Sequence, residues 1–270
     1  MKELGGRVAV ITGGASGVGR ATADLLASRG GRLALVDVNE ERLATAAKEL
    51  EARGTTVSTH VVDVADAEQM AALPADVVAR HGAAHILVNN AGVSVTASFE
   101  DHTLEDLQWI IGINLWGVIH GCKFFLPELK KADEAHIVNI SSMFGFIGMP
   151  SQSSYCATKF AVKGLTESLW IELQGTNVGV TSIHPGGIAT NIHETMRSYD
   201  DEIRDATVQG LAQSRPPSAV AEAIVKAIEA NKLRAIVGRE AYLADWMKRL
   251  LPVRTHRMLA KRMGNFGGRR

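Results

Sequence analysis

The sequence is poor in cysteine: Cys122 and Cys156 are the only two among its 270 residues. Two thiols cannot build the disulfide framework of a small secreted domain, so we expect reduced cysteines and a cytoplasmic protein. A signal peptide is not expected, because the first residues contain no apolar stretch. No apolar run approaches the roughly 18 residues of a membrane span, and we expect none.

Aromatic residues and net charge are also low. Phe, Trp and Tyr make up 5% of the chain, whereas glycine contributes 26 residues, a composition that favours glycine-rich turns over an aromatic-rich sandwich. The 29 basic residues balance the 29 acidic ones, so the chain lacks the positive field of a nucleic-acid-binding protein. His81 and His85 have a metal-ligand spacing, but Gly82 breaks the helix that would align them, and we expect no metal.

The basic residues are unevenly distributed. Residues 246–270 contain eight of them and no acidic residue, which leaves the rest of the chain with a net charge of −8. Residues 240–263 resemble an amphipathic helix, and Pro252 should kink or split it. Three interpretations stay open: a terminal helix that covers a cleft or packs in an oligomer, contact with an anionic membrane surface, and nucleic-acid contact. The sequence contains no nucleic-acid recognition motif, so we expect no nucleic-acid partner.

Short apolar runs alternate with longer stretches that carry apolar residues at helical spacing. This alternation predicts a Rossmann-type, doubly wound α/β fold with a parallel sheet of about seven strands in a single domain. The domain spans residues 1–240, and residues 241–270 form a basic amphipathic extension packed on or near it. Residues 186–217 are polar and irregular, and we expect a mobile or inserted segment there. The predicted strands are 7–12, 32–37, 56–62, 86–89, 136–140, 179–184 and 234–237.

A glycine-rich turn, TGGASGVG at residues 12–19, joins the first strand to a helix. Glycines permit a tight turn and let the backbone approach a pyrophosphate, and the helix N-terminus supplies free N–H groups. The spacing G-x-x-x-G-x-G differs from the most familiar dinucleotide fingerprint, and a glycine-rich turn without a ligand stays an alternative.

Asp37 ends the second strand, 18 residues after Gly19. An acid at this distance can accept hydrogen bonds from the adenosine ribose, and it would repel a 2′-phosphate. Val38 and Ser16 supply no positive charge that would offset this repulsion. The pattern therefore favours NAD over NADP, with a solvated strand-end carboxylate as the alternative.

Tyr155 and Lys159 are one helical turn apart on a helix-like run, 155–173, so both side chains lie on one face. Ser142 precedes Tyr155 by 13 residues and follows a predicted strand. Because the carboxyl ends of parallel strands gather in one crevice, we expect these three residues to meet where a cofactor binds. Ser141 is the neighbouring alternative to Ser142.

Several motifs occur together and in order: the turn at 12–19, NNAG at 89–92, Asn114, Ser142, the pair Tyr155-x-x-x-Lys159, and PG at 185–186. The set resembles the short-chain dehydrogenase/reductase family, and the resemblance covers residues 5 to about 240. It implies a catalytic set of Asn114, Ser142, Tyr155 and Lys159. It also implies cofactor contacts from Gly13, Ser16, Gly17, Val18, Gly19, Asp37, Asp63, Val64, Asn90, Gly92, Tyr155, Lys159, Pro185, Gly186, Ile188 and Thr190.

The chemistry expected of this set is hydride transfer between a nicotinamide cofactor and a secondary alcohol or ketone. A free tyrosine has a pKa of about 10, and we expect the Lys159 ammonium and the oxidised cofactor to lower it so that Tyr155 acts as general acid/base. The resemblance implies that Lys159 also holds the nicotinamide ribose, that Ser142 orients the substrate oxygen, and that Asn114 holds a water linking Lys159 to solvent. For Asp63 and for Asn89 a purely structural role stays equally open.

The predicted substrate is lipophilic. Residues 143–150 are apolar, carry no basic group and should border the substrate cleft, and Ile192, Met196 and Tyr199 add to this wall. The alternative is that these side chains pack against each other or against a neighbouring subunit. Family resemblance further suggests a homotetramer, with the Tyr155 helix and the helix around Asn114 at one interface. Two other functions stay open: a non-catalytic dinucleotide-binding sensor or scaffold, and a membrane-peripheral, lipid-processing dehydrogenase.

Overall fold

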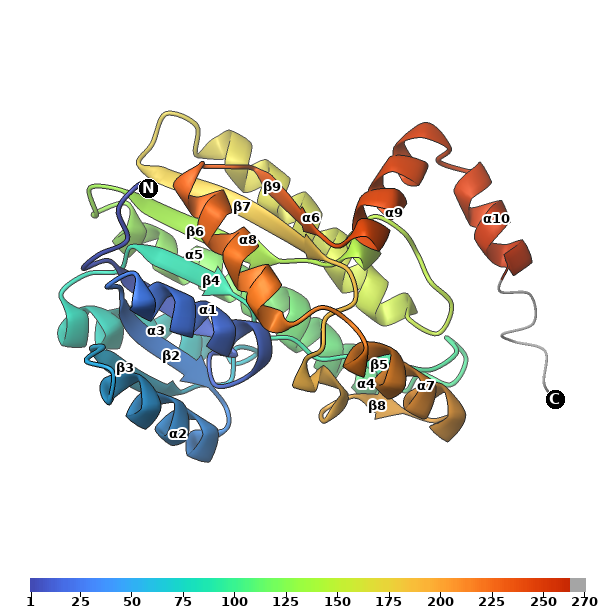
Figure 1. The fold of residues 1–270 in the computed structure, drawn as a ribbon, viewed down its shortest axis with the longest axis horizontal. Helices are drawn as coiled ribbons and strands as arrows, with labels where there is room; N and C mark the ends of the chain where they lie inside the picture. Colours follow the sequence, from blue (N-terminus) through green and yellow to red (C-terminus); the bar gives the residue numbers. More distant parts are fainter. Residues whose placement is uncertain (263–270) are drawn as a thin grey trace.

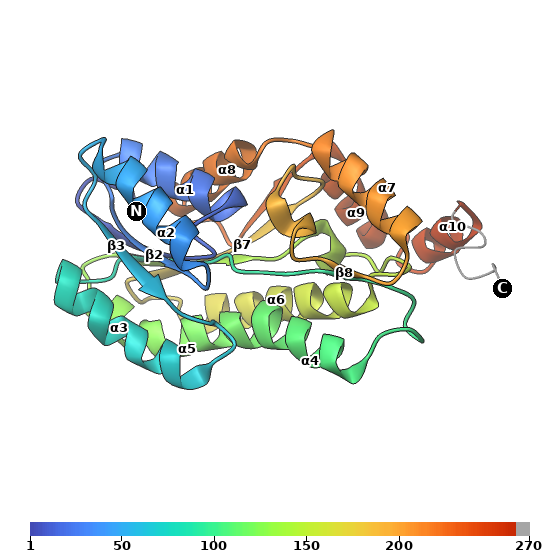
Figure 2. The ribbon, with the colours of Figure 1, turned by 90° about the horizontal axis from the view of Figure 1, so that it is seen from below.

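The computed structural model describes residues 1–262, and the last eight residues of the predicted basic segment 246–270 lie outside that range. Seven parallel strands form one sheet with helices on both faces (Figures 1 and 2), which confirms the predicted Rossmann-type fold. The strands begin and end within two residues of the predicted ones. They are β1 (Val8–Thr12), β2 (Arg32–Asp37), β3 (Val57–Val61), β4 (Ile86–Asn89), β6 (Ala135–Ile140), β7 (Val178–Pro185) and β9 (Arg234–Val237).

The strand order is β3-β2-β1-β4-β6-β7-β9. The chain winds outward from β1 to β3, returns to the middle of the sheet at β4, and then winds outward in the other direction. The order therefore reverses between β1 and β4. Ligands of doubly wound sheets bind at such a point, outside the carboxyl ends of the strands.

The central strands β1, β4 and β6 are buried on both faces, whereas the edge strands β3 and β9 are partly exposed. In β1, Val8 and Val10 pack on one side of the sheet, while Ala9 and Ile11 pack on the other. Two helical layers cover these faces (Figure 2). One layer contains α1 (Gly17–Ser28), α2 (Glu40–Glu51) and α8 (Pro217–Glu229); the other contains α3 (Ala67–His81), α4 (Leu104–Ile111), α5 (Gly117–Leu129) and α6 (Ser153–Glu172).

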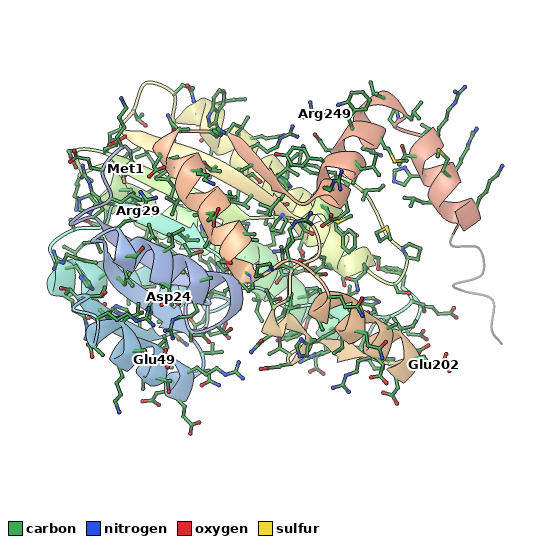
Figure 3. The ribbon with its side chains drawn as sticks, in the orientation of Figure 1. Met1, Asp24, Arg29, Glu49, Glu202 and Arg249 are labelled. Carbon is green, nitrogen blue, oxygen red and sulfur yellow. The ribbon has the colours of Figure 1, made fainter. Side chains whose placement is uncertain are left out.

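Ion pairs at the surface join neighbouring helices of the first layer. Arg29, after the end of α1, lies 3.4 Å from Glu229 of α8, and Arg20 bridges α1 to Glu49 of α2 (Figure 3 labels Arg29 and Glu49). Such exposed pairs contribute at most about 1 kcal/mol each, so the apolar layers carry the stability of the fold.

Residues 186–217 are more regular than expected. They contain α7 (Asp201–Ala212) and the short strand β8 (Arg197–Ser198), which pairs in parallel with β5 (Val95–Thr96). Arg197 and Tyr199 both bond to the buried carboxylate of Asp106 on α4, at 2.9 and 2.6 Å. The segment is therefore more regular than its sequence indicates, and this ladder and these bonds fasten it to the rest of the chain. That it is mobile or inserted stays a prediction.

The C-terminal extension is split as Pro252 predicts, into α9 (Arg239–Leu250) and α10 (Arg254–Arg262). The first of these contacts the edge strand β9 and the 3-10 turn Met143–Gly145, and its Ala241 and Ala244 are buried. Helix α10 projects away from the sheet (Figure 1).

One described helical stretch, Leu104–Leu129, is long and apolar enough to cross a membrane by length and composition alone. It consists of α4, a π-helical turn (Gly112–Trp116) and α5, and it packs against α3, α6 and β4. A core helix of a soluble protein passes the same test, so this stretch is weak evidence for a membrane span.

Candidate active site

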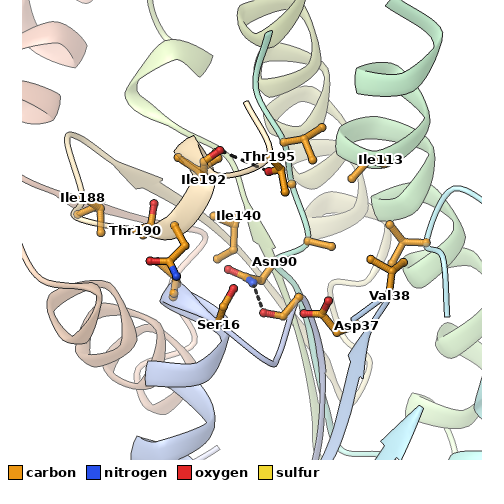
Figure 4. A pocket seen from close by; sticks show the side chains of 18 of the residues that line it. Ser16, Asp37, Val38, Asn90, Ile113, Ile140, Ile188, Thr190, Ile192 and Thr195 are labelled. Atoms are coloured by element: carbon orange, nitrogen blue, oxygen red, sulfur yellow. Dashed lines mark hydrogen bonds between the residues drawn. The ribbon is translucent and has the colours of Figure 1, made fainter. Parts of the chain in front are cut away.

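A cleft of about 390 Å³ lies where the strand order reverses, outside the carboxyl ends of the strands. Figure 4 shows side chains from both walls pointing into it, among them Ser16, Asp37, Asn90 and Thr190. All the predicted cofactor residues line this cleft except Gly19. Ser142 lines it too, whereas Asn114 lies behind the wall.

The glycine-rich turn forms the floor of the cleft. Gly13 and Gly17 have φ of 63° and 52°, which glycine adopts without strain. A Cβ at Gly19 would lie 2.1 Å from the carbonyl oxygen of Gly13, so this glycine allows close packing of α1 on the turn, and its predicted cofactor contact stays a prediction. The Asn90 amide donates to the carbonyl oxygens of Thr12 and Gly13 at 2.9 and 3.2 Å and fixes the turn.

Helix α1 begins in the cleft without a side-chain cap. Within the described chain, the Ser16 side chain forms no capping hydrogen bond, and the first turn contains no acidic residue. The free N–H groups and the positive end of the helix dipole therefore face the space that Ser16, Gly17 and Val18 line. Such a helix N-terminus can bind an anion, and its position in the cleft fits the pyrophosphate of a dinucleotide.

Asp37 lies at one end of the cleft. Its carboxylate accepts from the backbone N–H groups of Ala15 and Asn39, at 3.3 and 3.1 Å. Sequence reasoning missed Arg42, which lines the same end and pairs at 2.6 Å with Glu194 from the opposite wall. A basic residue in the first turn of the helix after β2 was the signal that could have revealed it.

Asp63 and Val64 border the same end, as predicted. The Asp63 carboxylate accepts from the Ala65 backbone N–H at 2.9 Å, which is the turn-capping role left open by the sequence. Asn89 lies outside the cleft lining and donates to Asn139 on the neighbouring strand at 2.8 Å. This bond between strands is the structural role that the sequence left open beside ligand contact.

Tyr155, Ser142 and Lys159 meet at the other end of the cleft. The Ser142 side chain lies beside the Tyr155 phenol and favours its ionised form, and the Lys159 ammonium lies 5.5 Å from the centre of the Tyr155 ring. The same ammonium donates to the carbonyl oxygen of Ile140 at 3.0 Å. Ser141 also lines the cleft, but its hydroxyl donates to the Lys159 carbonyl at 2.8 Å, so the geometry favours Ser142 as the partner of the phenol.

Burial dominates the protonation of this group. It raises the pKa of Tyr155 to about 12, although the Ser142 side chain acts in the opposite direction. It also lowers the pKa of Lys159 to about 8. We expected the Lys159 ammonium and the oxidised cofactor together to lower the pKa of Tyr155. In the protein alone burial sets the direction, and the lower pKa in the presence of the cofactor stays a prediction.

Asn114 is fully buried in the π-helical turn. Its side chain accepts from the Val93 N–H at 2.8 Å and donates to the Val93 carbonyl at 2.9 Å. A Cβ at Gly92 would lie 3.3 Å from Asn114 and 3.6 Å from the Lys159 ammonium, so all three are neighbours. The side chain holds the strand that follows NNAG, and the predicted water relay to Lys159 stays a prediction.

The predicted apolar substrate wall is only partly formed by the expected residues. Phe146 and Ile147 are buried, and Phe146 stacks on His184 with centroids 4.2 Å apart. Met196 is buried as well and contacts Thr96. Phe144 packs edge-on against Tyr155, and Ile192 lines the cleft. Phe146, Ile147 and Met196 are therefore packed inside the protein, which was the alternative to a place on the substrate wall. Tyr199 does not join that wall either, because its hydroxyl donates to Asp106.

Within residues 1–262, no three His, Cys, Asp or Glu side chains are grouped so that they could hold a metal.

A family model described as short chain dehydrogenase matches residues 7–201. The chain belongs to the short-chain dehydrogenases. It is therefore an oxidoreductase with the family's Rossmann fold. The matched region includes the glycine-rich turn, Asp37 and the Tyr155–Lys159 pair, whereas α8, β9, α9 and α10 follow it in sequence.

Several members of this family are similar along almost their whole length. The oxidoreductase SadH of Mycobacterium tuberculosis is 36% identical over 98% of both chains. The C alpha-dehydrogenase of a Sphingobium species is 35% identical, with 87% of this chain and 82% of that protein covered. A short-chain dehydrogenase/reductase of Burkholderia phymatum, solved in complex with NAD, superposes with a TM-score of 0.88 at 31% identity, covering 93% of this chain and 95% of that one.

Proposed function

We propose that this short-chain dehydrogenase interconverts a secondary alcohol and a ketone with NAD(H), using Tyr155 as general acid/base. The observation that carries the proposal is the cleft itself. It has an anion site in the middle, an acidic residue at one end, and Ser142, Tyr155 and Lys159 in contact at the other. NAD in the complex of the Burkholderia relative supports the choice of cofactor.

The turn residues and Asp37 would hold the adenosine and pyrophosphate, and Pro185, Gly186, Ile188 and Thr190 would border the nicotinamide. When bound, NAD supplies the hydride acceptor and a positive charge near Tyr155. Ser142 orients the substrate oxygen by a hydrogen bond, and the Tyr155 hydroxyl moves the proton at that oxygen. The positive charge of bound NAD would add to that of the Lys159 ammonium, so we expect the pKa of about 12 that burial gives Tyr155 to fall in the loaded enzyme.

Asp37 supports NAD over NADP because its carboxylate repels a 2′-phosphate. Arg42 is the cation that could favour NADP, but its guanidinium is paired with Glu194 at 2.6 Å. A non-catalytic sensor stays the weaker alternative, because a sensor has no use for the contact between Ser142 and Tyr155.

We infer a lipophilic substrate from the apolar side chains on the cleft walls. Val93, Ile113, Ile140, Ile192 and Leu211 line it. The cationic groups on its lining are Lys159 and Arg42, both of which already have partners within the described chain. A substrate carboxylate or phosphate would therefore find no free basic side chain among the described lining residues.

The predicted homo-oligomer fits the outward faces of α4 to α6. Apolar side chains are exposed there at Leu104, Trp116, Phe160 and Ile171. We propose that a second copy of the chain covers this face. Light scattering coupled to gel filtration measures the oligomeric state that tests the proposal. The tetramer and the cytoplasmic location stay predictions.

The C-terminal helices favour a membrane-peripheral form of the enzyme as a second candidate. Tyr242, Leu243, Trp246 and Leu250 are exposed at helical spacing along α9. Basic residues continue through α10 without an acidic one (Figure 3 labels Arg249), which is the composition of helices that bind anionic lipid surfaces. We propose that this stripe contacts such a surface. The test is cosedimentation of the protein with anionic vesicles. Binding by the wild type that Trp246→Glu abolishes would support the contact, and unchanged binding by Trp246→Glu would refute it.

Cofactor binding and turnover test the main proposal directly. Protein fluorescence should report tighter binding of NADH than of NADPH. A panel of lipophilic secondary alcohols, followed by NADH absorbance, should then yield turnover. Preferential binding of NADPH would overturn the role given to Asp37, and binding without turnover of any alcohol or ketone would favour the sensor.

A further inference from the structure

The segment that borders the predicted nicotinamide site, Pro185–Thr190, is held from behind by the C-terminal part of the chain. Pro185 and Val237 are partners in the β7–β9 ladder, and the Gly186 N–H donates to the Val237 carbonyl at 2.8 Å. Gly238 follows with φ of 109° and turns the chain into α9. This turn brings the first residues of α9 against the end of β7.

Glu240, in the first turn of α9, fills the space beside these glycines. A Cβ at Gly186 would lie 2.1 Å from Oε1 of Glu240, and a Cβ at Gly238 would lie 2.4 Å from the same atom. Burial opposes the ionisation of this carboxylate, whereas the nearby backbone N–H of Gly187 favours its charged form. Gly186 is therefore in direct contact with a charged group that does not line the cleft, and Gly187 lies next to it.

Arg215 completes the arrangement from a third direction. One guanidinium nitrogen donates to both carboxylate oxygens of Glu240, at 3.0 and 3.1 Å. Its backbone carbonyl accepts from the Ala189 N–H at 2.8 Å, and it forms an isolated parallel bridge with Ile188. One residue thus holds the far half of the segment by its backbone and orients, through its side chain, the carboxylate that holds the near half.

We propose that Glu240, oriented by Arg215, is a positioning residue that sets the 185–190 segment for the nicotinamide end of the cofactor. The inference rests on the proposed function. It assigns a role in the site to α9, which lies after the matched family region 7–201. The pair is partly exposed, with side-chain exposures of 41% for Glu240 and 37% for Arg215, so its loss should disturb the segment more than the global fold.

Comparing two ligands tests this role. ADP-ribose has the adenosine and pyrophosphate of NADH but no nicotinamide. Glu240→Ala and Arg215→Ala should weaken NADH binding about ten-fold or more, because a charged partner of the segment is lost. They should leave the affinity for ADP-ribose within about two-fold of wild type. Glu240→Gln, which keeps an acceptor near the Gly187 N–H, should restore part of the NADH affinity.

Glu229→Ala is the matched control, because Glu229 forms a surface ion pair with Arg29 far from the cleft and is similarly exposed, at 31%. It should change neither affinity. Equal weakening of both ligands by Glu240→Ala, or unchanged NADH affinity in both Glu240 and Arg215 variants, would overturn the inference. Failure of the wild-type protein to bind NADH or NADPH would instead overturn the proposed function, and this inference with it. Arg215→Lys provides a folded variant if either alanine variant is unstable.

Discussion

Two buried histidines make the fold sensitive to acid. His184 on β7 is 0% exposed, and its ring contacts the Ser142 carbonyl oxygen and the Ser182 hydroxyl at 3.0 and 2.8 Å. Burial lowers its pKa to about 4, although the contact with Ser142 opposes the shift. His136 on β6 is 1% exposed, and burial, with the positive N-terminus, lowers its pKa to about 3. In the unfolded chain both should titrate near 6.5.

Since both pKa values are lower in the folded state, the unfolded chain binds more protons between pH 6.5 and 4. The free energy of unfolding is therefore unaffected by these two rings above about pH 6.5. Below that pH it falls, because protons bind to the histidines of the unfolded chain but not to the buried rings. Each pH unit costs about 1.4 kcal/mol per histidine in this range. Between pH 7 and pH 5, His184 and His136 should each remove about 2 kcal/mol from the free energy of unfolding.

Urea unfolding at pH 7, 6 and 5 measures this loss. His184→Gln introduces an amide that can hydrogen-bond but cannot become charged. The decrease in its free energy of unfolding between pH 7 and pH 5 should therefore be smaller than that of wild type by about 2 kcal/mol. His256→Gln, at an exposed position on α10, should lose as much as wild type. An identical loss in wild type and His184→Gln would refute the reasoning, whatever the stability of the variant at pH 7.

Three further predictions concern the core and the cleft. Phe125→Ala, at a fully buried position, should lower the free energy of unfolding by about 3–5 kcal/mol, and calorimetry that finds less than about 1 kcal/mol would contradict its core role. Gly19→Ala should remove NADH binding, because its Cβ would lie 2.1 Å from the Gly13 carbonyl oxygen; tight binding in fluorescence titrations would show that the turn can move. Asp37→Ala should lower the ratio of NADH to NADPH affinity by about ten-fold, and an unchanged ratio would remove Asp37 from cofactor selection.

The central fold could be predicted because its inner strands are buried on both sides and are rich in apolar residues. Strand β1, for example, is fully buried and is apolar at four successive positions, 8–11. The glycine-rich turn and the spacing of Tyr155 and Lys159 could also be predicted, because each involves residues that are close together in the sequence. The structure brings Ser142 to them because β6 ends beside the start of α6.

The parts that could not be predicted depend on contacts between distant residues. Helix α7 has no buried residue, so no apolar periodicity marks it. The β5–β8 ladder has two residues in each strand and joins segments about a hundred residues apart. The pairing of Arg42 with Glu194, and the burial that raises the pKa of Tyr155, exist only once the two walls of the cleft face each other.

The most direct test of the account compares Tyr155→Phe with Tyr242→Phe, using a secondary alcohol that the wild-type enzyme oxidises. Tyr242 is an exposed tyrosine on α9 and should be dispensable for turnover. Removing the Tyr155 hydroxyl should reduce kcat by at least about 100-fold, because the mechanism assigns the proton transfer at the substrate oxygen to that hydroxyl, while NADH binding stays within about two-fold. Turnover of Tyr155→Phe at the rate of Tyr242→Phe would contradict the proposed mechanism.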